Sequence, residues 1–228
     1  MNNLEILYED NHLIVVVKRP NILSQSDITG DDDMLSLLKR YLKEKYHKPG
    51  NVYLGLVHRL DRVVGGVMVF AKTSKAAGRL SEEVRNKNFH KEYLAICHGK
   101  LKEKDTFIDY LKKQDDYKTI ISNQKDGKFS ELSYELLAYL KEKNLSLVKI
   151  DLKTGRHHQI RVQFASRGYP LLGDNRYGHD EKKEIGLFAF KLSFHHPITK
   201  DVMTFEYIPK EKPFDMFKIE LGGENEKR

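Results

Sequence analysis

The sequence has little cysteine: Cys97 is its one cysteine among 228 residues. A single thiol excludes a framework of internal disulfides, and a chain of this length buries enough core to fold without them. No run of about 18 apolar residues is present, which disfavours a membrane-spanning helix. The first five residues form neither a basic nor an apolar segment, so we expect no secretion signal and a cytoplasmic protein.

Motifs for nucleotide cofactors and metal ions are also missing. Gly65-Gly66 is followed by no Gly-Lys-Ser/Thr, and no glycine fingerprint for dinucleotides occurs. The histidine doublets at 157–158 and 195–196 lack the i,i+4 spacing of helical zinc ligands, and adjacent strand residues point to opposite faces. The sequence therefore predicts neither a cofactor nor a metal site. Cys97 lies in an alternating apolar run and is expected in the core.

Basic residues outnumber acidic ones, with 40 Lys and Arg against 33 Asp and Glu and a formal net charge of +7. Such an excess favours a polyanionic partner such as nucleic acid without establishing one. Four cations share one face of a helix predicted over Met34–Tyr46: Lys39, Arg40, Lys43 and Lys45. They either follow an RNA backbone or simply keep the helix solvated, and the sequence leaves both interpretations open.

Hydrophobic periodicity predicts more strands than helices. Strands are expected over Leu4–Tyr8, Leu13–Lys18, Val52–Val57, Val67–Ala71, Lys91–Cys97, Ser133–Tyr139, Leu145–Leu152, Leu187–Phe194 and Val202–Tyr207. Because strands and helices do not alternate strictly, the sequence predicts an α+β fold with a largely antiparallel sheet.

The remaining segments are interpreted as helices and turns. Helices are expected over Met34–Tyr46, over 74–85 with Ser74 as cap, and over 157–167 with Gly168 at the end. Residues 99–131 are interpreted as peripheral hairpins, such as Thr119–Ser122 with Lys128–Glu131 around the Asp126-Gly127 turn. Gly65-Gly66 is expected to turn the chain.

Two polar clusters have an unusual composition. The first, His58-Arg59-Leu60-Asp61-Arg62, places one aspartate among cations at the end of a predicted strand, although a solvated turn would have the same composition. The second, residues 154–162, collects two Arg and two His at a helix start, where acidic residues are the norm. A buried carboxylate from the first cluster would satisfy Arg161, and a phosphodiester would satisfy Arg156.

The first cluster resembles the signature of the RluA-like pseudouridine synthases, which isomerise uridine in RNA. In this chain His58-Arg59-Leu60-Asp61 is followed by a glycine and then by Val67–Lys72. Further segments resemble the family's other motifs in the same order: Tyr8–Lys18, Lys91–Ala95, Thr154–Arg161 with Gly173-Asp174 and Tyr177-Gly178, and Leu187–Ala189 with His196-Pro197. The ordered matches extend from about Leu4 to Pro209, and such a series is far more specific than one motif.

The resemblance implies a pseudouridine synthase catalytic fold, with a largely antiparallel, bent mixed sheet flanked by helices and a central RNA-binding cleft. It implies one catalytic domain over residues 1–220 and a C-terminal tail, 221–228, that is expected to fray. It also implies an isomerase of ribosomal or transfer RNA without a cofactor, because the reaction changes neither redox state nor atom count. No protein partner is evident, and a monomer is expected.

The resemblance assigns catalytic roles to Asp61, Tyr93 and Arg161. Asp61 would attack C1′ of the ribose or remove a proton from C2′, and both alternatives stay open. Arg161 would pair with Asp61 and keep its carboxylate ionised. Tyr93 would stack on the detached uracil and help remove the C5 proton, whereas the residue pattern alone predicts a packed strand tyrosine.

The residues expected to bind RNA are His58, Arg59, Arg62, Arg156 and His157. Arg59 would either enter the base stack when the target base flips out or contact a phosphate. His58 is expected to anchor its loop by a hydrogen bond and not to act as an acid or base.

The chain departs from the family pattern in two ways. Val64-Gly65-Gly66 stands where a Thr-Ser or Val-Ser pair usually precedes the glycine, so a loop hydroxyl is missing. The S4-type RNA-binding domain of many relatives is also not seen, so the catalytic domain is expected to recognise RNA. The missing hydroxyl leaves open a catalytically idle RNA-binding protein of the same fold. A hydrolase is disfavoured, because no second acid accompanies Asp61.

Overall fold

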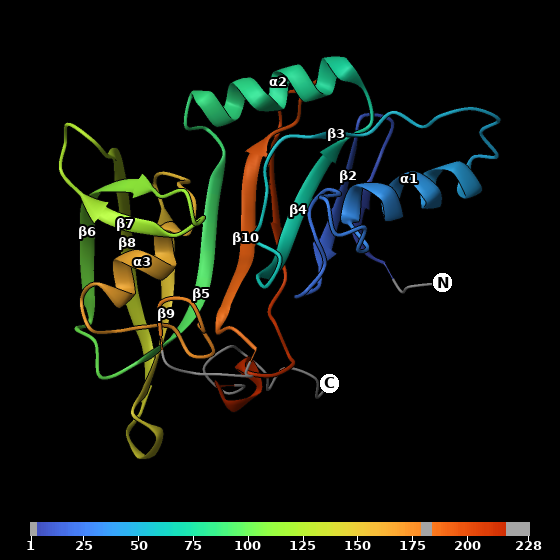
Figure 1. The fold of residues 1–228 in the computed structure, drawn as a ribbon. Helices are drawn as coiled ribbons and strands as arrows, with labels where there is room; N and C mark the ends of the chain where they lie inside the picture. The colour runs from blue at the N-terminus through green and yellow to red at the C-terminus, as the bar shows by residue number, and fades with distance from the viewer. Residues whose placement is uncertain (1–3, 179–183, 218–228) are drawn as a thin grey trace. The chain divides into compact units, whose positions relative to one another are not determined.

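The computed structural model describes residues 4–178 and 184–217, and the predicted tail and its boundary at residue 220 lie outside them. The chain divides into two compact units, one made of Met1–His90 with Lys191–Tyr207 and the other of Lys91–Phe190 with Ile208–Arg228. The fold is α+β with mostly antiparallel strand pairing, which confirms the predicted fold class (Figure 1). The predicted bend of the sheet and the central cleft stay predictions.

The first unit is built on the N-terminal hairpin that the sequence predicts. Its strands are β1 (Glu5–Glu9), β2 (Leu13–Lys18), β3 (Gly55–Leu56), β4 (Gly65–Ala71), β11 (Val202–Glu206) and the Lys191–His195 part of β10 (Leu187–His195). β2 pairs antiparallel with β1 and β4, and all six of its side chains are buried. Asp10 closes the β1–β2 turn by accepting the N–H groups of His12 and Leu13 at 2.7 and 2.6 Å.

Two amphipathic helices belong to the first unit: α1 (Met34–Lys45) and α2 (Ser74–Arg85). Both confirm the predicted helices, but the cap of α2 is Thr73 and not Ser74. Thr73 has an extended backbone, and its hydroxyl accepts the N–H of Ala76 at 3.2 Å. Ala76 and Leu80 then pack into the same core as β2 and β4.

Two predictions for the segment before β4 are wrong. Only Gly55–Leu56 of the expected strand Val52–Val57 pairs with β4. Gly65 and Gly66 do not turn the chain but begin β4, with Gly66 opposite Lys18 of β2. Strand pairing across the sheet overrides the turn preference of a glycine pair.

The second unit contains the β-rich part of the chain. It contains the Leu187–Phe190 part of β10 and all of β5 (His90–His98) except His90. Its other elements are β6 (Lys104–Lys113), β7 (Thr119–Ser122), β8 (Lys128–Leu140), β9 (Leu145–Leu152), α3 (Gln159–Ala165) and two 3₁₀ turns, η1 (Lys141–Lys143) and η2 (Phe214–Phe217). The strand order is β10-β5-β9-β8-β6-β7, and β8 and β9 form the predicted pair around the charged turn. Cys97 on β5 is fully buried, as predicted.

α3 is fixed to the sheet by an aromatic cluster. The ring of Phe164 lies 5.0 Å from that of Phe107 on β6 and 5.5 Å from that of Tyr134 on β8. Rings at these separations pack favourably, so the cluster sets the height of α3 above the strands. This short helix, in orange in Figure 1, carries Arg161.

The predicted hairpin between Thr119–Ser122 and Lys128–Glu131 is wrong in its pairing. β6, which the sequence did not predict, lies between these two strands and pairs antiparallel with both. Gly127 belongs to the connection, where its Cα lies too close to Tyr110 for a side chain. α3 also begins two residues later than predicted, at Gln159, because His158 has a left-handed backbone with φ of 51°.

Candidate active site

Asp61 lies in the loop between β3 and β4 of the first unit and is half-buried. Its carbonyl oxygen accepts the N–H of Val64 at 3.0 Å, which closes a turn around the aspartate. The preceding residue, Leu60, is pinned at both its backbone groups by the hydroxyl of Ser24, at 2.8 and 3.1 Å. The loop is therefore held by main-chain bonds that do not use the carboxylate of Asp61.

Lys18, at the end of β2, completes this support. Its side chain is fully buried, and Nζ donates to the carbonyl oxygens of Arg19, Ile22 and Arg62 at 3.2, 2.7 and 3.0 Å. Burial lowers the pKa of Lys18 to about 7, and the negative charge of Asp61 acts in the opposite direction. No motif predicts this role, although a lysine that ends a valine-rich strand is a signal for it.

Lys18→Met is expected to destabilise the protein by about 2–4 kcal/mol, because three carbonyl groups lose a buried donor. The loss should depend on pH. The pKa of Lys18 is lower in the folded than in the unfolded protein, so the wild type gains stability as pH rises above about 7, by at most about 1.4 kcal/mol per pH unit. Urea unfolding at pH 7, 8 and 9 measures both effects.

The Lys18→Met variant lacks the titrating group, so the stability difference between wild type and variant should change across this pH range. Lys43→Met, which removes an exposed lysine from α1, is the matched control and should leave stability and its pH dependence unchanged. Parallel pH curves for wild type and Lys18→Met would contradict the assignment.

The three RNA-binding candidates of the first cluster differ in their surroundings. His58 is buried, and its Nε2 accepts the N–H of Val69 at 3.1 Å, which confirms the predicted loop anchor. Arg59 is exposed. Arg62 is also exposed and forms an ion pair with Asp31 at 2.6 Å, so an RNA phosphate would have to replace this partner. Contact of all three with RNA stays a prediction.

Tyr93 lies in the second unit, on β5 opposite Ile150 of β9, and its side chain is buried with 7% exposed. Lys91 precedes it on the same face of the strand. Burial lowers the pKa of Lys91, and its Nζ lies so close to Gly155 that a Cβ there would be 3.1 Å away. The face of β5 that carries Tyr93 therefore also presents a partly desolvated cation.

Arg161 on α3 is buried and makes a two-pronged ion pair. Its Nε and Nη2 donate to the two carboxylate oxygens of Asp174 at 2.8 and 2.6 Å, and Asp174 is fully buried. Burial by itself would raise the pKa of Asp174, but the hydrogen bonds and charge of Arg161 outweigh it and hold the pKa below its ordinary value. A buried anion is thus present near this helix start, as expected, and it is Asp174, to which the motifs assign no role.

Backbone geometry fixes the position of Asp174. The preceding Gly173 has φ of 72°, and a Cβ on it would lie 2.2 Å from the carbonyl oxygen of Glu184. Only glycine fits such a position. The carboxylate also accepts the backbone N–H groups of Arg176 and Tyr177 at 3.0 and 3.1 Å, so these bonds orient it independently of Arg161.

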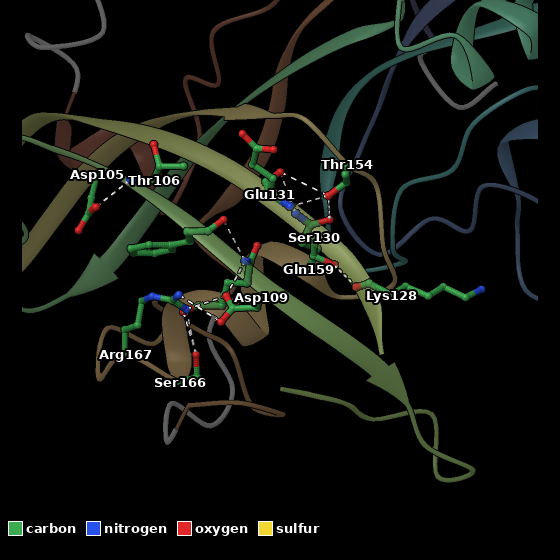
Figure 2. A network of polar contacts seen from close by, with 12 residues as sticks. Asp105, Thr106, Asp109, Lys128, Ser130, Glu131, Thr154, Gln159, Ser166 and Arg167 are labelled. Carbon is green, nitrogen blue, oxygen red and sulfur yellow. Dashed lines mark hydrogen bonds and ion pairs between the residues drawn. The ribbon is translucent and has the colours of Figure 1, made fainter. Parts of the chain in front are cut away.

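The loop before α3 is fixed by a second polar network, and Figure 2 shows the part of it that involves Glu131, Thr154 and Gln159. Thr154 accepts the N–H of Glu131 at 2.8 Å and donates to Oε1 of Gln159 at 2.9 Å. The same Oε1 accepts the N–H of Arg156 at 3.0 Å, and Nε of Arg156 donates to the carbonyl of Phe129. The exposed side chain of Arg156 therefore extends from a loop that these hydrogen bonds hold in place, which suits its predicted contact with a phosphate.

The histidine doublets serve protein contacts. His195 bonds Glu83 at 2.7 Å and His196 bonds Asp10 at 2.9 Å, both within the first unit. His157 is exposed, and its Nδ1 lies 2.9 Å from the hydroxyl of Thr119. Among the described residues, 4–178 and 184–217, no group of three or more His, Cys, Asp or Glu side chains is arranged to hold a metal ion.

Residues 12–166, more than half of the chain, match the family model described as RNA pseudouridylate synthase. The chain belongs to the RNA pseudouridine synthase family. Members of this family are isomerases that convert uridine in RNA to pseudouridine. The matched residues include Asp61, Tyr93 and Arg161, so the resemblance stated from the motifs is confirmed at the level of the family.

Individual pseudouridine synthases resemble the chain over most of its length. A dual-specificity RNA pseudouridine synthase, RluA, of Haemophilus influenzae is 35% identical over 211 residues, covering 89% of this chain and 91% of the relative. Ribosomal large subunit pseudouridine synthase D of Vibrio parahaemolyticus is 30% identical over 219 residues, covering 89% and 66%. The solved structure of human RNA pseudouridylate synthase domain containing 4 has a TM-score of 0.77 at 20% identity, covering 95% and 92%, and supports the fold.

Membership of a pseudouridine synthase family favours the isomerase over the idle RNA-binding protein and the hydrolase. The roles of Asp61, Tyr93 and Arg161 stay predictions, as does the pairing of Asp61 with Arg161. None of the helices in residues 4–178 and 184–217 is both long and apolar enough to cross a membrane.

Proposed function

We propose that this pseudouridine synthase modifies uridines of ribosomal or transfer RNA, with Asp61, Tyr93 and Arg161 as its catalytic residues. The observation that carries the proposal is the family match over residues 12–166, which contains all three side chains. The name of the Vibrio relative points to large-subunit ribosomal RNA as the first substrate to test. The proposed site of action is the cytoplasm, and the proposed enzyme is a monomer.

The proposed reaction is balanced without a cofactor. The C1′–N1 bond breaks, the uracil turns, and a C1′–C5 bond forms, while the proton on C5 leaves and N1 regains one. Asp61 supplies the anionic group that acts at C1′ or C2′. Arg161 favours the ionised form of that carboxylate, and a guanidinium already fixed by Asp174 would do so without reorganising.

Substrate binding follows from the same groups. The target nucleotide leaves its stack, which costs a few kcal/mol, and the exposed Arg59 is suited to fill the gap. Tyr93 stacks on the free uracil, and its oxygen helps remove the C5 proton while its own O–H proton passes to water. Arg62 and Arg156 contact phosphates, so binding should weaken as salt is added.

Release of tritium tests the function directly. The wild-type protein is incubated with large-subunit ribosomal RNA, and separately with transfer RNA, that carry tritium at uracil C5. Isomerisation releases tritium to water while the RNA chain stays intact. A binding protein would release none, and a hydrolase would free the base. Mapping pseudouridines in total RNA from a strain that lacks the gene then identifies the uridine, and no release from either RNA would contradict the proposal.

A further inference from the structure

Arg161 has a second neighbour that none of its proposed roles uses. The ring of Tyr177 lies against its guanidinium, with 5.3 Å between the ring centroid and Cζ. Asp174 holds one edge of the guanidinium through Nε and Nη2, and the tyrosine ring restricts motion out of that plane. Asp174 and Tyr177 together define one orientation for the side chain.

The hydroxyl of Tyr177 is itself fixed from two sides. The backbone N–H of Thr119, on β7, donates to it at 2.8 Å. Nδ1 of His158 lies 2.9 Å from the same oxygen. Thr119 is almost fully buried and also bonds His157, whose ring stacks on that of His158 at 3.7 Å. The tyrosine thus connects strand β7 to the start of α3.

The charges of this group are consistent with one direction of donation. Burial, followed by the charge of Arg161, lowers the pKa of His158 to about 3, so the imidazole is neutral near pH 7. Burial raises the pKa of Tyr177, so its hydroxyl keeps its proton. The hydroxyl accepts from Thr119 and donates to Nδ1 of His158, which leaves both side chains uncharged beside the guanidinium.

The backbone of His158 supports a specific role for its side chain. Its φ of 51° is left-handed, a conformation that residues other than glycine rarely adopt. No side chain caps α3 at this residue, so capping does not explain the conformation. The left-handed residue instead presents its ring to Tyr177, at 5.5 Å between centroids and nearly perpendicular.

We propose that Tyr177, held by His158 and Thr119, is a positioning residue that fixes the guanidinium of Arg161 in its working orientation. The inference rests on the proposed function, in which Arg161 keeps the catalytic carboxylate ionised. A neutral support of this kind restricts the arginine without altering its electrostatics, whereas a carboxylate in the same place would compete with Asp61 for the guanidinium and a protonated histidine would repel it. The pair of His158 and Tyr177 belongs to the second unit alone.

Tyr177→Phe tests the proposal, because it removes the hydroxyl and keeps the ring. Tritium release should show kcat lowered about tenfold with KM changed less than about twofold, since an arginine free to turn affects the chemical step more than binding. In an Arg161→Lys background the same change should have almost no further effect, because residues that act as one unit are not additive. Tyr110→Phe is the matched control and should keep wild-type kcat.

A second measurement does not depend on activity. ¹⁵N NMR is used to follow the side-chain Nε–H of Arg161, whose exchange with solvent should be about tenfold faster in Tyr177→Phe than in the wild type. If wild-type protein released no tritium, the proposed function would fail, and this exchange rate alone would decide the inference.

Unchanged Nε–H exchange, or an equal loss of kcat in the wild-type and Arg161→Lys backgrounds, would overturn the proposal. Urea unfolding shows whether each variant folds. If Tyr177→Phe does not fold, His158→Phe replaces it, because a phenyl ring still stacks on His157 and no longer accepts the hydrogen bond of Tyr177. The same outcomes then apply to that variant.

Discussion

Asp61→Asn is expected to lower the rate of tritium release by about 10³-fold or more, the scale seen when a group that acts in the chemical step is removed. Asparagine has the same shape as aspartate but carries no charge and is a poor nucleophile. The variant should still fold, since Lys18 and Ser24 hold the loop through the carbonyls of Arg62 and Leu60 and not through the carboxylate. The urea midpoint of the variant should accordingly stay close to that of the wild type.

Asp32→Asn is the matched control for this experiment. It removes an exposed carboxylate from the same unit, where its loss should change neither kcat nor stability. Comparable rates for wild type and Asp61→Asn would contradict the assignment of the catalytic aspartate. If the variant lost activity and also unfolded, the loss of activity would be attributed to a disrupted loop and not to the missing charge. Circular dichroism and urea unfolding distinguish these two results.

Much of the fold follows from local patterns in the sequence. The strand β5 forms where Lys91–Cys97 predicts a strand, although residues 93–97 are buried on both of its faces, and β8 and β9 meet around a charged turn as expected. β6 was missed because its ten residues carry many charges, and only Phe107 and Leu111 among its side chains are fully buried. Its place between β7 and β8 depends on pairing between strands, which no single segment encodes.

For the candidate site, too, local motifs can be predicted from the sequence and long-range partners cannot. Motifs point to Asp61, Tyr93 and Arg161 as candidate catalytic residues, because these residue types occur at the spacing of a known family. The residues that support them were not identified: Lys18 bonds a carbonyl 44 residues away, and Arg161 pairs with an aspartate 13 residues further on. Such partners are chosen by the folded chain, where a buried polar group must find a matching one.

The second large effect is expected from Asp174→Asn. The change takes the bidentate carboxylate of Asp174 away from a guanidinium that is only 5% exposed, and it sets an amide N–H₂ against the Arg161 N–H groups. Breaking a buried pair from one side costs about 3–5 kcal/mol, so the urea midpoint should fall sharply. Tritium release should fall as well, even at temperatures where the variant is folded, because Arg161 loses the carboxylate that orients it.

The loss of stability caused by Asp174→Asn should become smaller at low pH. The pKa of Asp174 is held below its ordinary value in the folded protein, so its contribution to stability is present above about pH 4 and is lost as pH falls through the lower folded value. The difference in unfolding free energy between wild type and Asp174→Asn should therefore be largest near pH 7 and should shrink below pH 4. A difference that did not depend on pH would mean that shape, and not charge, sets the cost.

Two further variants distinguish a lost charge from a lost contact. Asp109→Asn breaks another aspartate–arginine pair of the same unit, but Arg167 is 29% exposed, so water reaches this pair more easily than that of Arg161 and the loss should be smaller, about 1 kcal/mol (Figure 2). The double variant Arg161→Met with Asp174→Asn should be more stable than Asp174→Asn alone, because no charge is then left buried. It should nevertheless stay inactive, since the proposed chemistry needs the guanidinium whether or not the fold does.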